Sequence, residues 1–425
     1  MYQAPRGTQD ILPDEQPYWN YVKSNARQVA HLYGYGAIET PIFEDTQLFL
    51  RSVGETSDIV QKEMYTFLDK GENSLTLRPE GTAPIGRAYL EHGLSNQPQP
   101  VKLYTIGPFF RYDRPQAGRY RELHQFSYEA IGEIDPALDA EIIAMSWDYL
   151  TRLGLRELSI QLNSIGCPIC RPHYVEALRE YYRGKVAELC LDCQTRLERN
   201  PLRLLDCKNR ACNAVAESAP RSIDYLGEEC SGHFQRLEEL LHSLAIPYQI
   251  NNRLVRGLDY YTKTVFEVYS TETGSQSSLG GGGRYDGLIE QLGGRPTPAV
   301  GFAAGLERTI LNLKKQGITP PSRPGVVAFV ASLGDGTEVA VSRLVAQLRA
   351  ADIAALQSFG RRSLKSQLKH AHASGARFTL ILGPDELATG RVVLRDMEKS
   401  TQEAVDQSTV VELLLKGVRG PTPNP

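Results

Sequence analysis

The sequence lacks the features of an exported or membrane-bound protein. No apolar run reaches the roughly 18 residues that a membrane-spanning helix needs. The N-terminal stretch, Met1 to Gln16, is polar and is interrupted by Pro5 and Pro13, so it resembles neither a secretory signal nor an Arg-rich transit peptide. These absences predict a cytoplasmic protein with no membrane partner.

The sequence also carries little net charge. The net charge is −3, which excludes a protein that coats nucleic acid through its overall charge. A local basic surface stays open, because a partner responds to the local field rather than to the total.

Cysteines are few and unevenly placed. Six of the seven lie within residues 167–212, and in a reducing cytosol such a group indicates a metal site or free thiols rather than disulfides. Cys167-x2-Cys170 and Cys190-x2-Cys193 are separated by 19 residues, a spacing typical of zinc ribbons. One hypothesis is therefore a structural zinc ion bound by these four cysteines.

The alternatives for this cluster stay open. Cys207 and Cys212 form a looser third pair, and a helical hairpin before them could return them towards Cys167 and Cys170. The ligand set is therefore ambiguous. Reduced, partly buried thiols without a metal are the other interpretation.

The chain divides into two predicted domains, because 425 residues are too many for one ordinary core. Gly317 to Gly325 is rich in proline and glycine and is the clearest linker. We predict a first domain over residues 1–320, a linker core at 321–325 and a second domain over 326–425. Residues 166–230 are Cys-rich, helical and charged, as expected of an insertion.

The two domains differ in pattern. In the first, strand-like runs at Val101–Phe110 and Leu123–Ile131 flank proline and glycine, which predicts a long antiparallel hairpin. Beyond the linker, strands alternate with helices, which predicts a small, largely parallel α/β domain. The strands expected there are Val326–Ala331, Ala354–Leu356 and Phe378–Leu382, and the helices are Thr337–Ala350, Leu364–Ser374 and Thr409–Lys416.

The hairpin carries Arg111, Arg114, Arg119 and Arg121. Guanidinium groups match phosphate oxygens bidentately, and a strand holds them rigidly. The two phenylalanines before Arg111 place it against an apolar wall. This favours a phosphate site over a solvated, charged hairpin.

Three further segments suggest ligand contacts but have ordinary alternatives. Gly280–Gly283 fits neither a dinucleotide fingerprint nor a P-loop, and predicts either close backbone packing under a ligand or a flexible loop. Gly301–Arg308 suits helix packing as readily as a site. Arg78–Thr82 offers a carboxylate and a hydroxyl to an ammonium group, or forms a turn with a helix cap.

Taken in order, these segments resemble the three motifs of class II aminoacyl-tRNA synthetases. Gly34–Glu44 resembles the first motif, and Phe110-Arg111-Tyr112-Asp113 together with the second strand of the hairpin resembles the second. Gly301–Arg308 resembles the third. Each motif is degenerate, but their order and spacing agree with that class.

Within that class, Arg256-Gly-Leu-Asp-Tyr-Tyr-Thr262 is similar to the signature of the histidyl-tRNA synthetase family. Leu162–Gly166 and Arg78–Thr82 also resemble that family, and the resemblance runs from Pro5 to about Leu415. It implies an α+β catalytic domain on an antiparallel sheet, a helical insertion and a C-terminal α/β anticodon-binding domain. It also implies a homodimer that activates L-histidine with ATP and Mg²⁺, then transfers it to the 3′ end of tRNA(His).

The resemblance assigns roles at the phosphates. Arg111 and Arg256 would be catalytic, Arg111 on the α-phosphate and Arg256 where other subfamilies use a metal ion. Asp113 and Arg308 would complete the ATP site with Arg111. Two residues depart from the class: Asp113 stands where glutamate is usual, and Leu123 where an aromatic ring would stack on adenine. Both departures would tune the affinity for ATP.

The implied histidine pocket consists of Glu80, Thr82, Gln125, Glu129, Tyr260 and Tyr261. The first three would hold the α-ammonium group, while Glu129 and Tyr261 would read the imidazole nitrogens. Neutral imidazole offers one donor and one acceptor. A site built for such partners rejects isosteres without them by about 10⁴–10⁵-fold.

The implied tRNA contacts lie in both domains. The hairpin candidates for the acceptor end are Arg114, Gln116 and Arg119. No acidic residue stands between Asp352 and Asp385, so a basic track is expected there. Its candidates are Arg361, Arg362 and Lys365, and a solvated helix face is the alternative.

Two other functions are the alternatives. A catalytically inactive relative that regulates histidine biosynthesis would resemble the catalytic core but lack the anticodon module and parts of the Arg256 segment, both of which are present. A synthetase for another amino acid conflicts with the combination of Glu129 and Arg256–Tyr261.

Overall fold

The computed structural model describes residues 2–54, 57, 59–114, 118–270, 278–321 and 325–418. The chain forms two compact units, Met1–Pro321 and Ser322–Pro425, and each is described by itself. None of the helices in these residues combines the length and apolar character that crossing a bilayer requires.

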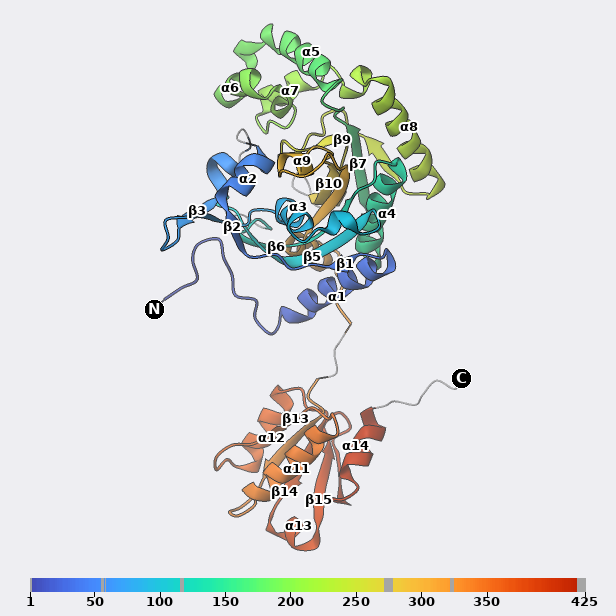
Figure 1. The fold of residues 1–425 in the computed structure, drawn as a ribbon. Coiled ribbons are helices and arrows are strands. Elements are labelled where there is room, and N and C mark those ends of the chain that lie inside the picture. Colours follow the sequence, from blue (N-terminus) through green and yellow to red (C-terminus); the bar gives the residue numbers. More distant parts are fainter. Residues whose placement is uncertain are drawn as a thin grey trace. The chain divides into compact units, whose positions relative to one another are not determined.

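An eight-stranded sheet forms the centre of the first unit (Figure 1). Its order is β1 (Gly36–Ala37), β5 (Val101–Phe110), β6 (Glu122–Ile131), β11 (Ala299–Gly305), β10 (Ser278–Arg284), β9 (Thr262–Ser270), β7 (Leu158–Ser164) and β8 (Tyr248–Ile250). The two edge pairs, β1–β5 and β7–β8, are parallel, and the pairs between them are antiparallel. The prediction of an α+β domain on an antiparallel sheet is confirmed.

Strands β5 and β6 form the expected hairpin, paired from Val101 with Ile131 to Phe110 with Glu122. The run Gly280–Gly283 lies inside strand β10, so the prediction of a flexible loop there is wrong. Close packing is the reason for these glycines: a Cβ added at Gly282 would lie 2.8 Å from Phe302 Cα on β11.

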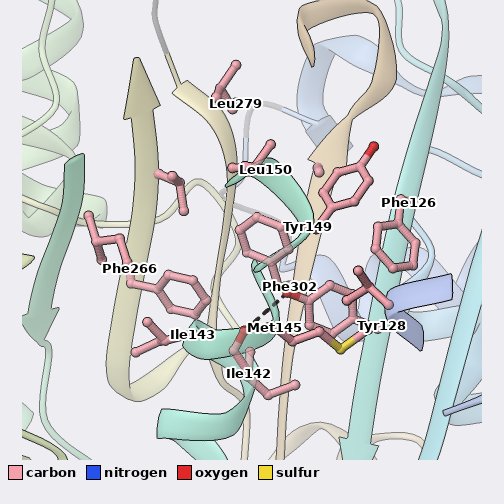
Figure 2. Close-up of a cluster of buried hydrophobic side chains, with 14 of the residues drawn as sticks. Phe126, Tyr128, Ile142, Ile143, Met145, Tyr149, Leu150, Phe266, Leu279 and Phe302 are labelled. Carbon is pink, nitrogen blue, oxygen red and sulfur yellow. Dashed lines mark hydrogen bonds between the residues drawn. The ribbon is translucent and has the colours of Figure 1, made fainter. Parts of the chain in front are cut away.

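The two faces of the sheet have different environments because side chains alternate along a strand. On one face Phe126, Phe266 and Phe302 pack against Tyr149 of α4 (Pro136–Arg152), as Figure 2 shows. The rings of Phe266 and Phe302 are stacked with their centroids 5.4 Å apart. Burying each such side chain stabilises the fold by about 1.5–3 kcal/mol. Their sequence neighbours Glu267 and Gly301 line a cleft instead.

Three more helices pack on this core: α1 (Gln16–Leu32), α8 (Glu228–Ser243) and α10 (Leu306–Lys315). A three-stranded sheet runs in the order β2 (Phe43–Asp45), β4 (Ser74–Leu77) and β3 (Tyr65–Leu68). Near it in sequence lie α2 (Thr46–Val53), η1 (Ile59–Glu63), α3 (Thr82–Glu91) and η2 (Leu94–Asn96), and α9 (Leu288–Gln291) contacts α3.

The insertion is helical, as expected, and lies at one end of the unit (Figure 1). It contains α5 (Arg171–Arg183), η3 (Val186–Glu188), α6 (Leu191–Arg199), η4 (Pro201–Leu204), α7 (Arg210–Ala216) and η5 (Ser222–Tyr225). Most of these elements are shorter than three turns, so packing rather than intrinsic propensity must hold them.

The second unit is a five-stranded sheet with helices, but it is less parallel than predicted. Its order is β13 (Ala355–Gln357), β12 (Ala328–Ser332), β14 (Phe378–Leu382), β15 (Arg391–Asp396) and β16 (Thr401–Asp406). The first three strands are parallel, whereas β15 and β16 are added antiparallel. Neither β15 nor β16 was predicted from the sequence, and β16 is an exposed edge strand with little apolar content. The helices are α11 (Glu338–Ala350), α12 (Leu364–Ala373), α13 (Pro384–Thr389) and α14 (Val410–Val418).

Candidate active site

A cleft of about 1260 Å³ lies over the sheet face opposite the aromatic core. Small-molecule sites commonly measure ~300–1,000 Å³, so this cleft has room for more than one small ligand. It brings together every predicted histidine-pocket, ATP-binding and catalytic residue: Glu80, Thr82, Arg111, Asp113, Gln125, Glu129, Arg256, Tyr260, Tyr261 and Arg308.

One end of the cleft holds two buried carboxylates joined through a hydroxyl. Glu80 accepts the backbone N–H groups of Thr82 and Ala83 at 2.7 and 2.9 Å, which satisfies two free donors at the start of α3. The Thr82 hydroxyl donates to Glu129 at 2.9 Å. The helix cap expected from Arg78–Thr82 is therefore present, and Glu80 supplies it.

Glu129 is the most perturbed acid in this group. Burial raises its pKa to about 8, and the nearby charge of Glu80 adds to the shift, although hydrogen bonds from Tyr285 and Thr82 oppose it. Glu129 pairs across the sheet with Gly301, where any Cβ would overlap its carboxylate. Because Gly301 has no side chain, the carboxylate of Glu129 can occupy this space.

Three phenols surround the carboxylates. The ring of Tyr260 lies 4.7 Å from that of Tyr261 and 5.5 Å from that of Tyr285. Tyr285 donates its hydroxyl to Glu129, and Tyr260 donates to Glu80 at 3.5 Å. Burial raises the pKa of all three hydroxyls, so they stay protonated and act as donors.

Arg256 lies further along the same wall, half-buried and paired with Glu267 of β9. Its guanidinium is 5.7 Å from the centre of the Tyr261 ring. Burial alone would lower its pKa, but the charge of Glu267 more than offsets this and raises it. Arg256 Nε is buried with no hydrogen-bond partner in the described parts of the chain.

Arg111 and Arg308 bring positive charge into the same cleft. Arg111 donates its Nε to the Pro79 carbonyl at 2.7 Å, which aims the rest of the guanidinium away from that strand. Arg308 donates to the carbonyls of Gly118 and Ser278 at 3.2 and 2.9 Å. Burial lowers the pKa of Arg308, and the charges of Arg119 and Arg111 contribute. Such a cluster is stabilised by an anion.

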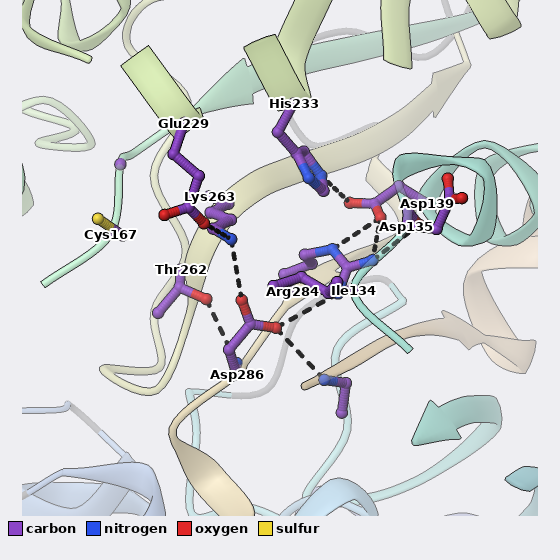
Figure 3. Close-up of polar contacts among 12 residues, drawn as sticks. Ile134, Asp135, Asp139, Cys167, Glu229, His233, Thr262, Lys263, Arg284 and Asp286 are labelled. Atoms are coloured by element: carbon purple, nitrogen blue, oxygen red, sulfur yellow. Dashed lines mark hydrogen bonds and ion pairs between the residues drawn. The ribbon is translucent and has the colours of Figure 1, made fainter. Parts of the chain in front are cut away.

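A polar network holds Arg284, the residue before Tyr285 (Figure 3). The fully buried Arg284 donates to Asp139 of α4 at 2.7 Å and to the carbonyls of Glu133 and Asp135 at 3.0 Å. Burial would raise the pKa of Asp139, but Arg284 and then His233 lower it below its ordinary value. These contacts hold the end of β10 in place. Tyr285 follows β10 directly and lines the cleft.

Several contributors to this site were missed from the sequence. Tyr285, Glu267 and Glu307 line the cleft, and Glu307 accepts the backbone N–H and the ring nitrogen of His124 at 2.9 Å. Only Glu307 had a sequence signal, since it lies in the third motif-like segment. The other two depend on strand pairing.

The predicted tRNA residues are spread more widely. Arg114 is exposed, Arg119 forms an ion pair with Asp113 at 3.2 Å, and Gln116 lies outside the described residues. In the second unit Arg362 and Lys365 are exposed, while Arg361 pairs with Asp335 at 3.1 Å.

The cysteines group differently from the first hypothesis. Cys190 and Cys193 cluster with Cys207 and Cys212, whereas Cys167 and Cys170 cluster with Cys230. The chain folds α6 and α7 together, so the third cysteine pair joins the second pair and not the first.

A sheet of this topology, with arginines over one cleft and a separate C-terminal mixed sheet, defines a class II aminoacyl-tRNA synthetase. A model of the histidyl-tRNA synthetase family matches residues 7–309, and one of an anticodon-binding domain matches residues 327–417. The chain belongs to the histidyl-tRNA synthetase family.

Individual relatives agree with this assignment. The chain is 56% identical over 405 residues to a protein of Dehalococcoides mccartyi strain 195 named histidine–tRNA ligase, covering 95% of this chain and 97% of that one. It is 53% identical to the Moorella thermoacetica protein of the same name, covering 97% of each. The crystal structure of apo Staphylococcus aureus histidyl-tRNA synthetase is similar, with a TM-score of 0.82, 38% identity, and coverage of 97% of this chain and 100% of that one.

Proposed function

We propose that this chain is a histidine–tRNA ligase, which activates L-histidine with ATP and transfers it to the 3′ end of tRNA(His). The observation that carries the proposal is the buried Glu129, bonded to Tyr285 and Thr82 in the same cleft as Arg256 and Arg111. This is a hydrogen-bonding pocket next to an anion site. The relatives named above support the choice of amino acid.

In the histidine pocket, Glu129 accepts an imidazole N–H and the protonated Tyr261 donates to the other ring nitrogen. Both are ligand contacts that neutral imidazole can satisfy. Glu80, Thr82 and Gln125 hold the α-ammonium group, and Tyr260 orients Glu80 through its hydroxyl. An apolar amino acid of similar size would leave buried polar groups unpaired, which explains selection without a second, editing site.

In the activation step, a histidine carboxylate oxygen attacks the α-phosphorus of ATP, and the bond to the leaving pyrophosphate breaks. Arg111 and Arg256 hold the two reacting anions together and neutralise charge at phosphorus. Asp113 positions the hairpin through Arg119, and Arg308 binds the outer phosphates. Fixed charges suit this reaction because the groups around the phosphorus then need little reorganisation as the reaction proceeds.

The proposed ATP site suits Mg²⁺ carried by the nucleotide. The acidic groups Asp113, Glu267 and Glu307 line the cleft, but each is paired with a cationic or imidazole partner. Mg²⁺ commonly keeps several waters and binds substrate phosphates. We propose that phosphates and water, rather than a protein cage, supply most of its ligands.

The tRNA would contact both predicted domains. We propose that residues 1–320 catalyse the reaction, with Arg114, Gln116 and Arg119 near the acceptor end. Residues 326–425 would bind the anticodon, where the exposed Arg362 and Lys365 face solvent beside Arg361. Ser363 accepts the N–H of Ser366 and begins α12 there, so a defined element presents the basic track.

We propose a cytoplasmic homodimer. The three-stranded sheet exposes Ile42, Phe43, Phe67 and Leu68, which keep 45, 51, 43 and 66% of their accessible surface. The ring centroids of Phe43 and Phe67 lie 6.3 Å apart, so these two side chains form one apolar patch. Contiguous exposed apolar surface commonly marks a protein interface, and this patch adjoins the first motif-like segment.

A regulatory subunit of histidine biosynthesis is the alternative. The anticodon-domain match at 327–417 and the assembly of Arg111, Arg256 and Arg308 in one cleft do not favour it.

ATP–pyrophosphate exchange across the twenty amino acids tests the function. Exchange is expected with histidine alone, and Arg256→His should lower its rate by about 10²–10³-fold while preserving the fold. Arg236→His is the matched control, because Arg236 is exposed on α8 and pairs with Glu239. Exchange with another amino acid, or none at all, contradicts the proposal.

A further inference from the structure

Four cysteines of the insertion converge in space although they lie on three segments. Cys190 precedes α6, Cys193 lies in its first turn, Cys207 follows η4, and Cys212 lies in α7. Their Sγ atoms all lie within 4.8 Å of one another. Cys193, Cys207 and Cys212 are buried and Cys190 is partly exposed.

The spacing of the sulfur atoms suits a metal and not a disulfide. Cys190 Sγ and Cys207 Sγ are 3.8 Å apart. In a tetrahedral zinc site with Zn–S bonds of about 2.3 Å, neighbouring sulfurs are about 3.8 Å apart. A disulfide would need about 2.05 Å. Four sulfurs also fill the coordination sphere, as in structural rather than catalytic zinc sites.

Backbone donors already surround these sulfurs. The N–H of Cys190 donates to Cys212 Sγ at 3.2 Å, and the N–H of Asn209 donates to Cys207 Sγ at 3.4 Å. Such donors stabilise thiolates and orient metal ligands. Without a cation, four sulfurs packed so closely could not all ionise, because like charges would repel.

The elements that carry the cysteines are too short to be stable by themselves. Helix α6 has nine residues and α7 has seven, and isolated helices shorter than ~12–15 residues are marginal in water. Their buried apolar neighbours include Leu189, Leu197, Leu204 and Val215. Small folds of this kind commonly depend on a metal or disulfides.

We propose that Cys190, Cys193, Cys207 and Cys212 bind one structural zinc ion that holds the insertion wall of the cleft. Leu205, Asp206 and Lys208 line the cleft beside this cluster. Asn213, next to Cys212, accepts from Arg253, and Asn200 donates to Asp259 at 3.2 Å. The zinc site thus supports the segment that carries Arg256, from outside the reacting groups.

The other cysteine group is a control within the same chain. Cys167, Cys170 and Cys230 supply three sulfurs, and the described residues add no fourth His, Cys, Asp or Glu to that group. The charge of Arg171 lies beside these sulfurs and opposes a second cation. We assign the zinc to the four-cysteine group alone.

Metal analysis of the full-length chain, purified without chelator, tests the proposal. About one zinc per chain is expected in the unaltered protein and in Cys230→Ser, and less than about 0.1 in Cys212→Ser. If Cys212→Ser fails to fold, cobalt(II) exchange into the unaltered chain replaces it. The d–d absorption of tetrahedral cobalt with four thiolates is then expected in both the unaltered chain and Cys230→Ser.

Three results would overturn the assignment. They are less than about 0.3 zinc per chain in the unaltered protein, full zinc in a folded Cys212→Ser, or loss of the zinc in Cys230→Ser. The readout is metal content, so it is independent of whether the chain charges tRNA with histidine.

Discussion

At the scale of single residues, Tyr285 has the role that sequence reasoning missed. Its hydroxyl donates to the buried Glu129, and hydrogen bonds between neutral groups contribute about 0.5–1.5 kcal/mol. Because burial keeps Glu129 protonated near neutral pH, Tyr285→Phe is expected to raise the KM for histidine by about 2–12-fold, measured by pyrophosphate exchange. The control is Tyr182→Phe, whose hydroxyl is buried without a partner among the described residues. Equal KM values for the two variants would contradict the role.

The pKa of Glu129, raised by burial to about 8 from an ordinary value near 4.5, predicts a pH dependence. Between pH 4.5 and about 8, Glu129 keeps its proton in the folded chain but has lost it in the unfolded chain. The contribution of Glu129 to the free energy of unfolding is therefore fully present below pH 4.5 and is lost as the pH rises to about 8. In calorimetry without ligands, the Tm of Glu129→Gln minus the Tm of the unaltered protein should increase from pH 5 to about 8 and stay constant above that. A Tm difference independent of pH would show that Glu129 has an ordinary pKa.

At the scale of elements, one glycine of the β10 run, Gly281, leaves room for the guanidinium group of Arg256. A Cβ at Gly281 would overlap Arg256 Nη1 and lie 2.9 Å from Glu267 Cγ. Gly281→Ala should displace the Arg256–Glu267 pair and lower kcat by about 10²-fold, since misplacement by about 1 Å can cost that much. Tm should change little. Gly287→Ala is the control, because no atom lies within 4 Å of its added Cβ; an equal loss of kcat in both would refute this account.

Elements were predicted well where periodicity was strong. The strand Val101–Phe110 and the three helices predicted in the second unit have the expected types and nearly the expected bounds, because apolar residues recur along each of them, whereas the short helix α13 was not predicted. The glycine-rich β10 and the exposed β16 were not predicted as strands. Their pairing is determined by neighbouring strands, and neither carries the alternation that a single sequence displays.

At the scale of the whole molecule, each unit has a core of its own. Clusters around Phe126 and Phe302 lie in the first unit, and one around Val330 and Leu380 lies in the second. Residues 1–321 alone are therefore expected to fold and to keep histidine-dependent pyrophosphate exchange near the full-length rate. Charging of tRNA should fall by about 10²-fold or more, since a second binding module commonly adds ~10²–10⁴-fold. Equal charging by both forms would contradict an anticodon role for the second unit.

The sequence by itself determined the class of fold and the family, and it predicted a set of site residues that meet in one cleft. These depend on local strings such as Arg256–Thr262 and on regular apolar patterns. The tertiary structure alone decided which residues meet. It placed Tyr285 on Glu129 and Glu267 on Arg256, and it joined Cys207 and Cys212 to Cys190 and Cys193 rather than to Cys167. The reason is physical: strand register and helix packing set these distances across long separations in sequence, and no local pattern records them.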